Sequence, residues 1–211
     1  MINLAQIIFF LLIVKPFMAF FIGLRVYGRK NIPNKYPFIL VANHSSHLDA
    51  IALLGLFPLK TLKNVRPVAA FDYFETNKLR SFFAHTFFNI ISIRRKDLSK
   101  HEDPLLPLEK ALDNGQSLIF FPEGTRSLTG EIGQFHSGVI HLLERKPEIP
   151  LVPVYLSNMA RTLPKGETIP VPFFCDLHIG GMISLRGTRS EMLKAIRDAL
   201  ILLQEGEDSH A

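Results

Sequence analysis

A histidine and an aspartate share a polar stretch that separates two apolar runs of the chain. The stretch Val41–Asp49 contains His44 and Asp49 in the pattern H-x-x-x-x-D. The run before it, Phe38–Val41, is typical of a buried strand, and the run after it, Ala50–Phe57, favours a helix. An aspartate in a first helical turn can reach back to an imidazole at a strand end, fix its tautomer and stabilise the imidazolium. The two residues therefore predict a general base.

The same residues also fit plainer interpretations. Asp49 fits an acid that the dipole favours near a helix start, with His44 as a hydrogen-bonded loop histidine. From this stretch alone that interpretation stays open. A metal-dependent phosphoesterase is a further alternative, because His44 and His47 stand at H-x-x-H spacing close to Asp49. Since no further cluster of ligand residues nearby in sequence completes a site, we predict no metal.

A second polar stretch follows another apolar strand. The sequence F-F-P-E-G-T-R-S begins at Phe120, and its turn presents Glu123, Thr125, Arg126 and Ser127. Backbone N–H groups of such a turn, with an arginine beside them, suit an oxyanion or a phosphate. The alternative is a polar loop shaped only by proline and glycine. That alternative leaves unexplained why so many functional groups directly follow a strand.

Two further stretches carry weaker signals. Arg94 follows an apolar run, and arginine binds phosphate in a bidentate manner, although a solvated pair with Arg95 is an equal alternative. The run Ile149–Tyr155 contains Pro153, which predicts a sheet edge or a bulge that walls an apolar pocket. The serines lack the G-x-S-x-G context of a nucleophile, and no Walker-type loop occurs.

These residues need a framework of alternating strands and helices. Such alternation predicts one α/β domain with a mostly parallel central sheet flanked by helices. The predicted strands are 37–42, 65–70, 89–93, 117–121, 151–156 and 174–179, and the predicted helices are 50–57, 78–88, 103–112 and 190–204.

The N-terminal stretch Leu4–Leu24 is strongly apolar and about as long as the roughly 20 residues that cross a bilayer. The pair Lys15-Pro16 disfavours a straight span, so we predict two kinked helices that lie in one leaflet. A buried core helix is the alternative, and a signal peptide is disfavoured because no basic residue precedes the run. The basic residues that follow, Arg25, Arg29, Lys30 and Lys35, predict that the rest faces the cytoplasm, at the inner membrane if the source is bacterial.

The composition agrees with one domain that touches lipid. The chain has 211 residues, of which 47% are hydrophobic, and a formal net charge of +5. We predict a membrane-associating helical segment at 1–27, a catalytic domain at 28–205 and a flexible tail at 206–211. The positive charge favours acidic partners such as anionic lipids, phosphorylated substrates or an acidic carrier protein. No nucleic-acid module is recognisable, and the single Cys175 excludes an internal disulfide.

In this order, the four stretches resemble the glycerolipid acyltransferase family, whose best-known members are 1-acylglycerol-3-phosphate acyltransferases. The resemblance covers residues 37–155 by motif. H-x-x-x-x-D alone is weak evidence, but its combination with F-P-E-G-T-R-S is specific. The resemblance implies that His44 removes the proton of a lysolipid hydroxyl and that Asp49 orients and charge-balances it. It also implies direct attack on an acyl thioester, and a glycerol-phosphate site made of Arg94, Glu123, Gly124, Thr125 and Arg126.

The implied function is that of a membrane-associated acyltransferase in phospholipid biosynthesis. It would move a fatty acyl group from acyl-CoA or acyl carrier protein to a lysophospholipid, foremost 1-acylglycerol-3-phosphate, with no cofactor besides the thioester. Two positions depart from the family pattern: Asn89 replaces an expected glycine, and Phe135-His136-Ser137-Gly138 lacks the lysine of F-K-x-G. A different acceptor, such as an amino-acid-headed lysolipid, is therefore an alternative, as are a hydrolase or transacylase activity and a non-catalytic lipid-binding module.

Overall fold

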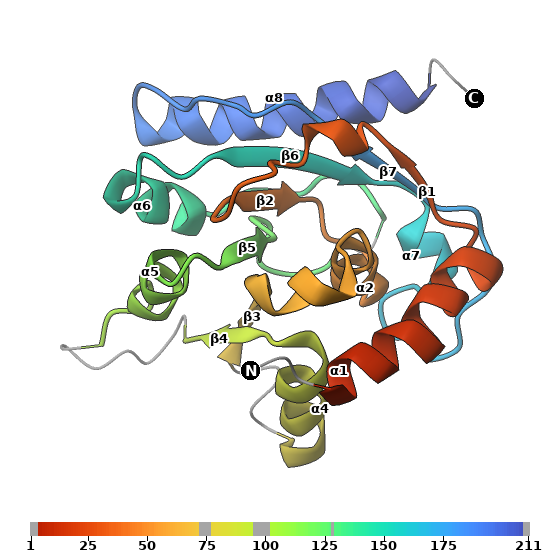
Figure 1. The fold of residues 1–211 in the computed structure, drawn as a ribbon. Helices are drawn as coiled ribbons and strands as arrows, with labels where there is room; N and C mark the ends of the chain where they lie inside the picture. Colours follow the sequence, from red (N-terminus) through yellow and green to blue (C-terminus); the bar gives the residue numbers. More distant parts are fainter. Residues whose placement is uncertain (1–3, 72–76, 95–101, 128, 209–211) are drawn as a thin grey trace.

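The computed structural model describes residues 4–71, 77–94, 102–127 and 129–208. Its centre is a seven-stranded sheet with the order β1-β7-β6-β2-β5-β3-β4 (Figure 1). Neighbouring strands are parallel except β6 and β7, so β1 and β7 run against the other five. The strands are β1 Arg25–Tyr27, β2 Ile39–Ala42, β3 Val65–Ala70, β4 Ile91–Ile93, β5 Ser117–Phe120, β6 Leu151–Leu156 and β7 Asp176–Ile179.

Helices cover both faces of this sheet, and the predicted single α/β domain is confirmed. The α-helices are α1 Leu4–Phe9, α2 Leu48–Gly55, α4 Lys78–Phe88, α5 Leu106–Asp113, α6 Gly138–Arg145, α7 Met159–Thr162 and α8 Arg189–Asp208. Two π-helical stretches, η1 Phe10–Val14 and η2 Phe17–Phe21, continue α1, and two 3₁₀ turns are η3 Arg29–Asn31 and η4 Leu59–Asn64.

Strand β2 shows why helices cover both faces of the sheet. Every residue of β2 is buried, and successive side chains point to opposite faces. Leu40 packs with α2 and the N-terminal helix on one face, whereas Ile39 and Val41 pack with α5, α6 and α8 on the other. A continuous apolar run is thus the pattern of a central strand.

Parallel pairing brings two loops to one edge of the sheet. Strand β2 pairs with β5 in the register Val41 to Phe120, so both strands end at the same edge. The loop after β2 carries His44, and the loop after β5 carries Glu123. Open α/β sheets bind ligands beyond the carboxyl ends of their strands. We call this side the catalytic edge.

The N-terminal stretch is one continuous helical run from Leu4 to Phe21, not the predicted kinked pair. On each side of Pro16 the backbone adopts wide turns, with the Lys15 N–H bonded to the Phe10 carbonyl and the Ile22 N–H bonded to the Phe17 carbonyl. Such local π adjustment re-satisfies backbone groups that a proline frees.

One stripe of this helix belongs to the hydrophobic core. Phe10, Val14, Met18 and Ile22 recur every four residues and are at most 4% exposed. Only 22% of the run is buried, and its other faces display leucine, isoleucine and phenylalanine to the outside. The helix is therefore joined to the domain along its length and is apolar on its free side.

Several boundaries differ from the predicted ones. The segment predicted to end at residue 27 contains β1, in which Arg25 forms a bidentate ion pair of 2.6 Å with Asp176. The sequence did not predict β1, because its three residues are too few to show an alternating pattern. Helix α8 runs to Asp208, so the predicted tail at 206–211 starts inside it. Helix α6, which starts at Gly138, was not predicted.

The prediction for Pro153 holds only in part. This proline lies inside β6, between β2 and β7, so it is not on an edge strand. Beside it the pairing of β6 with the chain after β7 shifts by one residue, from Val154–Ile179 to the bridge Leu151–Ile183, which is a bulge. The strand tolerates it because its carbonyl still accepts the Gly180 N–H at 2.9 Å. Glycine at position 180 also leaves room, since a Cβ there would lie 2.9 Å from the proline ring.

Candidate active site

His44 and Asp49 meet at the catalytic edge. The His44 Nδ1 and the Asp49 Oδ2 are 2.9 Å apart, with the histidine side chain 20% exposed and the aspartate side chain fully buried. Asp49 lies in the first turn of α2, and His44 lies two residues beyond β2. When Nδ1–H donates to the carboxylate, Nε2 of the ring is left as a proton acceptor. This geometry suits a general base.

The carboxylate of Asp49 is fixed by backbone groups as well. Its Oδ2 also accepts the N–H groups of Ser45 at 2.7 Å and Ser46 at 2.8 Å. Asp49 therefore bonds backbone amides at a helix start and orients an imidazole at the same time. The two interpretations of the sequence describe one arrangement, because the amides hold the carboxylate where the ring needs it.

The imidazole of His44 also lies on an aromatic ring. Phe121, the first residue after β5, stacks on it with centroids 4.2 Å apart and an interplanar angle of 22°. The carboxylate and this ring together leave the imidazole little rotational freedom. The sequence marked Phe121 only as the end of a strand, since stacking across two loops leaves no local pattern.

Glu123 ties the two loops together. Its Oε1 accepts the His44 N–H at 2.9 Å, and its Oε2 accepts the Gly133 N–H at 3.2 Å. Burial raises the pKa of the Glu123 carboxyl above its usual range, and the two N–H bonds partly offset this. The residue is 6% exposed. In this structure each oxygen of Glu123 binds a backbone N–H, so the residue positions the loop that carries His44, and its predicted contact with the acceptor stays a prediction.

We expect Glu123→Gln to destabilise the fold, because the amide group cannot accept the second backbone N–H, a loss of about 1–3 kcal/mol. The folded pKa is raised, so the native state holds this proton more tightly than the unfolded chain. The stabilisation by Glu123 is then greatest below its ordinary pKa of 4.5 and declines as the pH rises through the folded value.

Denaturant unfolding at several pH values from about 4 to about 7 checks this sign. The difference in free energy of unfolding between wild type and Glu123→Gln should narrow as the pH rises. A widening difference would contradict the assigned pKa direction. The exposed Glu131, changed to Gln in the same way, is the matched control, and its variant should be about as stable as the wild type.

The turn after Pro122 has features that suit an anion. Gly124 has φ +69°, in the left-handed region that glycine adopts without strain, and its N–H closes the turn on the Phe121 carbonyl at 3.1 Å. In Arg126 the Nη1 atom is buried and has no hydrogen-bond partner among the described residues. Thr125 is exposed beside it. A guanidinium nitrogen left in this state can bind an acidic oxygen of a ligand.

The Ser127 N–H bonds the His44 carbonyl at 2.8 Å, so this turn and the catalytic pair form one unit.

Arg94 lies apart from the His44–Asp49 pair. It directly follows β4, the last strand of the sheet, and three strand spacings of about 4.8 Å, or about 14 Å, separate β4 from β2. Its guanidinium lies over the Phe71 ring at 4.5 Å and faces Glu102 at 3.8 Å. The side chain is 47% exposed. Arg94 thus shares the edge with His44 but does not join the cluster in this conformation.

Other residues of the loop between β2 and α2 were not predicted to hold the site in place. The Asn43 side chain donates to the Leu156 carbonyl at 2.9 Å and accepts the Leu156 N–H at 2.8 Å, which fastens the loop to β6. The Ser46 hydroxyl donates to the Leu163 carbonyl at 3.0 Å. Asn and Ser are common loop residues, so their types alone did not single them out. Within the described ranges no group of three metal-ligating side chains occurs.

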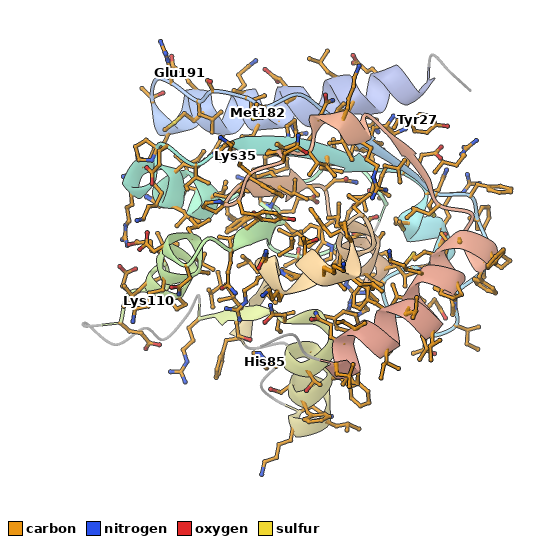
Figure 2. The ribbon with its side chains drawn as sticks, in the orientation of Figure 1. Tyr27, Lys35, His85, Lys110, Met182 and Glu191 are labelled. Atoms are coloured by element: carbon orange, nitrogen blue, oxygen red, sulfur yellow. The ribbon has the colours of Figure 1, made fainter. Side chains whose placement is uncertain are left out.

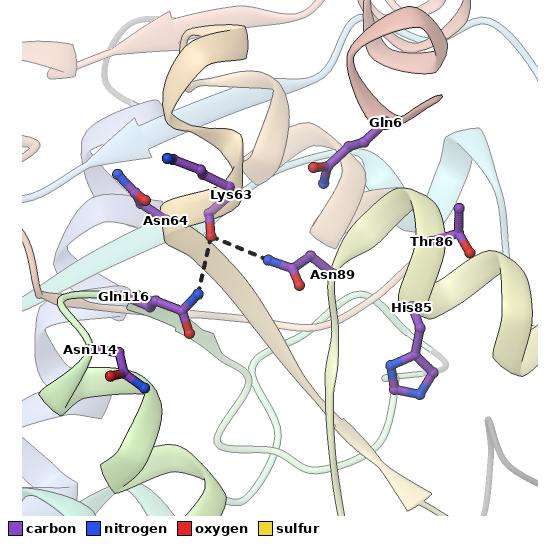
Figure 3. A pocket seen from close by; sticks show the side chains of 8 residues that line it. All are labelled: Gln6, Lys63, Asn64, His85, Thr86, Asn89, Asn114 and Gln116. Carbon is purple, nitrogen blue, oxygen red and sulfur yellow. Dashed lines mark hydrogen bonds between the residues drawn. The ribbon is translucent and has the colours of Figure 1, made fainter. Parts of the chain in front are cut away.

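A polar cavity of about 320 Å³ lies elsewhere (Figure 3). It is lined by Gln6, Lys63, Asn64, His85, Thr86, Asn89, Asn114 and Gln116. Several of these residues precede β3, β4 or β5, so the cavity lies toward the opposite edge from His44. The amides of Asn89 and Gln116 both donate to the Lys63 carbonyl at 3.3 Å (Figure 3).

Asn89 in this cavity also explains one departure from the family pattern. It has φ +52° and occupies the position where glycine was expected. Asparagine is among the residues that adopt this left-handed conformation most readily. Asn89 therefore adopts a backbone conformation that a glycine at this position would also adopt without strain.

Comparison with known proteins places this geometry in context. The family model described as "Acyltransferase" matches residues 23–157. A chloroplastic 1-acyl-sn-glycerol-3-phosphate acyltransferase of Brassica napus is 31% identical over 67% of this chain and 39% of its own length. The corresponding protein of Saccharomyces cerevisiae is 33% identical over 67% of this chain and 46% of its own length. The chain thus spans less than half of these relatives.

The fold is also found in a crystal structure of a 1-acyl-sn-glycerophosphate acyltransferase from Thermotoga maritima. The two structures superpose with a TM-score of 0.69 at 24% sequence identity, over 87% of this chain and 72% of the other. The mostly parallel sheet with flanking helices is shared.

Proposed function

The chain belongs to the acyltransferase family, and we propose that it transfers a fatty acyl group from a thioester to the free hydroxyl of a lysophospholipid. The observation that carries the proposal is the His44–Asp49 pair, buried on one side and open at the catalytic edge. The relatives from Brassica napus and yeast are named for acylation of 1-acyl-sn-glycerol 3-phosphate, which makes this lysolipid the first candidate acceptor. Its product would be phosphatidate, a step of phospholipid biosynthesis.

In the proposed reaction, Nε2 of His44 takes the proton of the acceptor hydroxyl as the hydroxyl oxygen attacks the thioester carbonyl carbon. A carbon–oxygen bond forms, and the tetrahedral adduct then collapses with cleavage of the carbon–sulfur bond. The thiolate leaves and receives the proton from the imidazolium. Asp49 holds Nδ1–H throughout and stabilises the charged ring. Direct attack needs no acyl-enzyme.

The acceptor phosphate would bind at the turn after β5. Support comes from the unpaired Nη1 of Arg126 and from the glycine turn beside His44. Arg94 would reach this phosphate only after leaving Glu102 and Phe71. His136 stands where the family pattern has a lysine, so a less charged or amino-acid-headed acceptor is the second candidate.

Membrane association is part of the proposal. The N-terminal helix is apolar on its free side and packed into the domain on the other, which supports a helix lying in the plane of one leaflet. A helix that crossed the bilayer would draw the attached domain in with it. The basic residues that follow, Arg25, Arg29 and Lys30, favour the cytoplasmic side.

A thiol-release assay tests the function. Full-length protein is given acyl-CoA or acyl carrier protein together with lysophosphatidate, an amino-acid-headed lysolipid or no acceptor. We expect thiol release that depends on an acceptor, and fastest with lysophosphatidate. Equal release without acceptor would identify a hydrolase instead, and loss of activity with a chelator would favour the metal-dependent alternative. Absence of release with every donor and acceptor would refute the proposal.

A further inference from the structure

The chain after α7 exposes a second group of large apolar side chains. We call residues 169–174 the apolar loop. Its sequence is Ile-Pro-Val-Pro-Phe-Phe, and the exposed fractions are 78% for Ile169, 49% for Val171, 37% for Phe173 and 70% for Phe174. Two prolines in six residues hold the backbone extended without a partner strand.

Contacts fix the apolar loop between the N-terminal helix and the loop that carries His44. The Val171 N–H donates to the Thr162 carbonyl at 2.8 Å. The Phe174 ring lies against Gly23, where an added Cβ would come within 2.5 Å of it. Leu163, which directly follows α7 and precedes the apolar loop by six residues, accepts the Ser46 hydroxyl at its carbonyl. Figure 1 shows this segment beside the end of the N-terminal helix. The exposed apolar side chains of the apolar loop thus project from a segment that these contacts hold in place.

The surroundings indicate what covers the apolar loop. The Arg161 guanidinium lies over the Phe173 ring at 5.0 Å. That of Arg25, whose charge is paired with Asp176, lies over the Phe174 ring at 5.9 Å. Lys165 is exposed nearby, with Glu167 as the one acid between residues 163 and 174. Apolar tips with arginine at their base match the boundary between acyl chains and anionic headgroups.

The apolar loop also continues the free side of the N-terminal helix. Phe20 is 91% exposed and Phe21 is 39% exposed, and both stand just before Gly23, against which Phe174 packs. The two segments, far apart in sequence, therefore form one apolar surface. A surface of this kind, rimmed by charge, marks an interaction site.

We propose that the apolar loop inserts into the surface of an anionic bilayer as a second lipid contact at the catalytic edge. The inference rests on the membrane association in the proposed function and extends it to a segment outside the N-terminal helix. Because Val171 bonds Thr162 and the next residue, Leu163, bonds Ser46, insertion would hold the loop that carries His44 at the lipid surface. A lysolipid then reaches the base without leaving the bilayer interface.

The chain contains no tryptophan, so one introduced tryptophan reports on one site. Full-length Ile169→Trp is mixed with vesicles of phosphatidylcholine and phosphatidylglycerol. We expect a blue-shifted emission and quenching by lipids brominated on their acyl chains. The control is Met182→Trp, since Met182 is 64% exposed and lies beside α8 (Figure 2). It follows the end of β7, which starts at the catalytic edge and runs to the opposite edge of the sheet. Its emission should stay unchanged.

Flotation of the protein with the vesicles distinguishes failure of this inference from failure of membrane association. If Ile169→Trp floats with the vesicles but its emission does not change, the inference fails while membrane association stands. If the protein does not float at all, membrane association fails with it, whatever the acyltransferase assay gives. A blue shift that needs no vesicles and grows with protein concentration would assign the loop to a second copy of the chain and overturn the proposal.

A loss-of-contact variant gives an independent measure. Ile169→Ser with Phe174→Ser should weaken vesicle binding at least ~10-fold, because two large apolar groups leave the lipid. Ile169→Ser alone keeps the packing of Phe174 on Gly23 and should show a smaller loss. Met182→Ser should bind as the wild type does. Equal binding by all variants would refute the inserted loop.

Discussion

Replacing His44 with alanine is expected to lower kcat by ~10²-fold or more while the protein stays folded. The scale is that of general-base catalysis, since alanine removes the group that accepts the hydroxyl proton in the proposed reaction. His44 is 20% exposed at its side chain, and its backbone bonds to Glu123 and Ser127 do not depend on the ring. The thermal midpoint should therefore change little. Initial rates of thiol release with saturating lysolipid measure the effect.

The matched control is His141→Ala. His141 lies on α6, with its side chain 37% exposed and paired with Glu144. Its loss should leave kcat near the wild-type value. If His44→Ala retained full activity, the proposed mechanism would be wrong, whatever the fold of the variant.

A second large effect is expected on the free side of the N-terminal helix. Leu12 is 67% exposed and Phe20 is 91% exposed, so changing both to serine should leave the core intact. Each side chain gains about 1.5–3 kcal/mol from burial in an apolar medium, and every 1.4 kcal/mol is about tenfold in affinity. Vesicle binding of the double variant should therefore fall by ~100-fold or more. Co-sedimentation with vesicles of graded lipid concentration measures it.

Met18→Ala is the control for a change on the buried side of the same helix. Met18 is on the buried stripe of the same helix and only 4% exposed. Its truncation should cost about 2–5 kcal/mol of stability and leave vesicle binding near the wild-type value. Deletion of the whole helix is a poorer test, since it also removes this stripe from the core. A double variant that still bound vesicles fully would show that the anchor lies elsewhere.

Sequence reasoning singled out this candidate site because the chemistry it predicts depends on residue type. A histidine and an aspartate between a strand and a helix, and a glycine turn with arginine after a second strand, are visible without coordinates. Parallel pairing then brings the two loops together, as the alternation of elements predicts. The N-terminal apolar stretch was found for the same reason, because its composition differs from the rest of the chain.

What the sequence could not reveal depends on backbone groups. The two N–H groups bound to Glu123 belong to His44 and Gly133, and any residue would supply them. Sequence reasoning therefore assigned Glu123 to the ligand and did not predict these two bonds. The orientation of Arg94 depends on its contact with Phe71, which no spacing predicts. Strand β1 is defined by its pairing with β7, a long-range partner.

The reversal of two strands decides which side of the molecule would meet lipid in the proposed membrane association. Strand β6 ends at the catalytic edge, and β7 starts there because it runs back beside β6. Strand β1 is parallel to β7, so it starts at that edge too, with Arg25 beside Asp176. The segments that precede β7 and β1 are the apolar loop and the N-terminal helix. Were both strands parallel to β2, these segments would arrive at the far edge, with the whole sheet between lipid and His44. Strand direction thus places the N-terminal helix, the apolar loop and His44 at the same edge of the sheet.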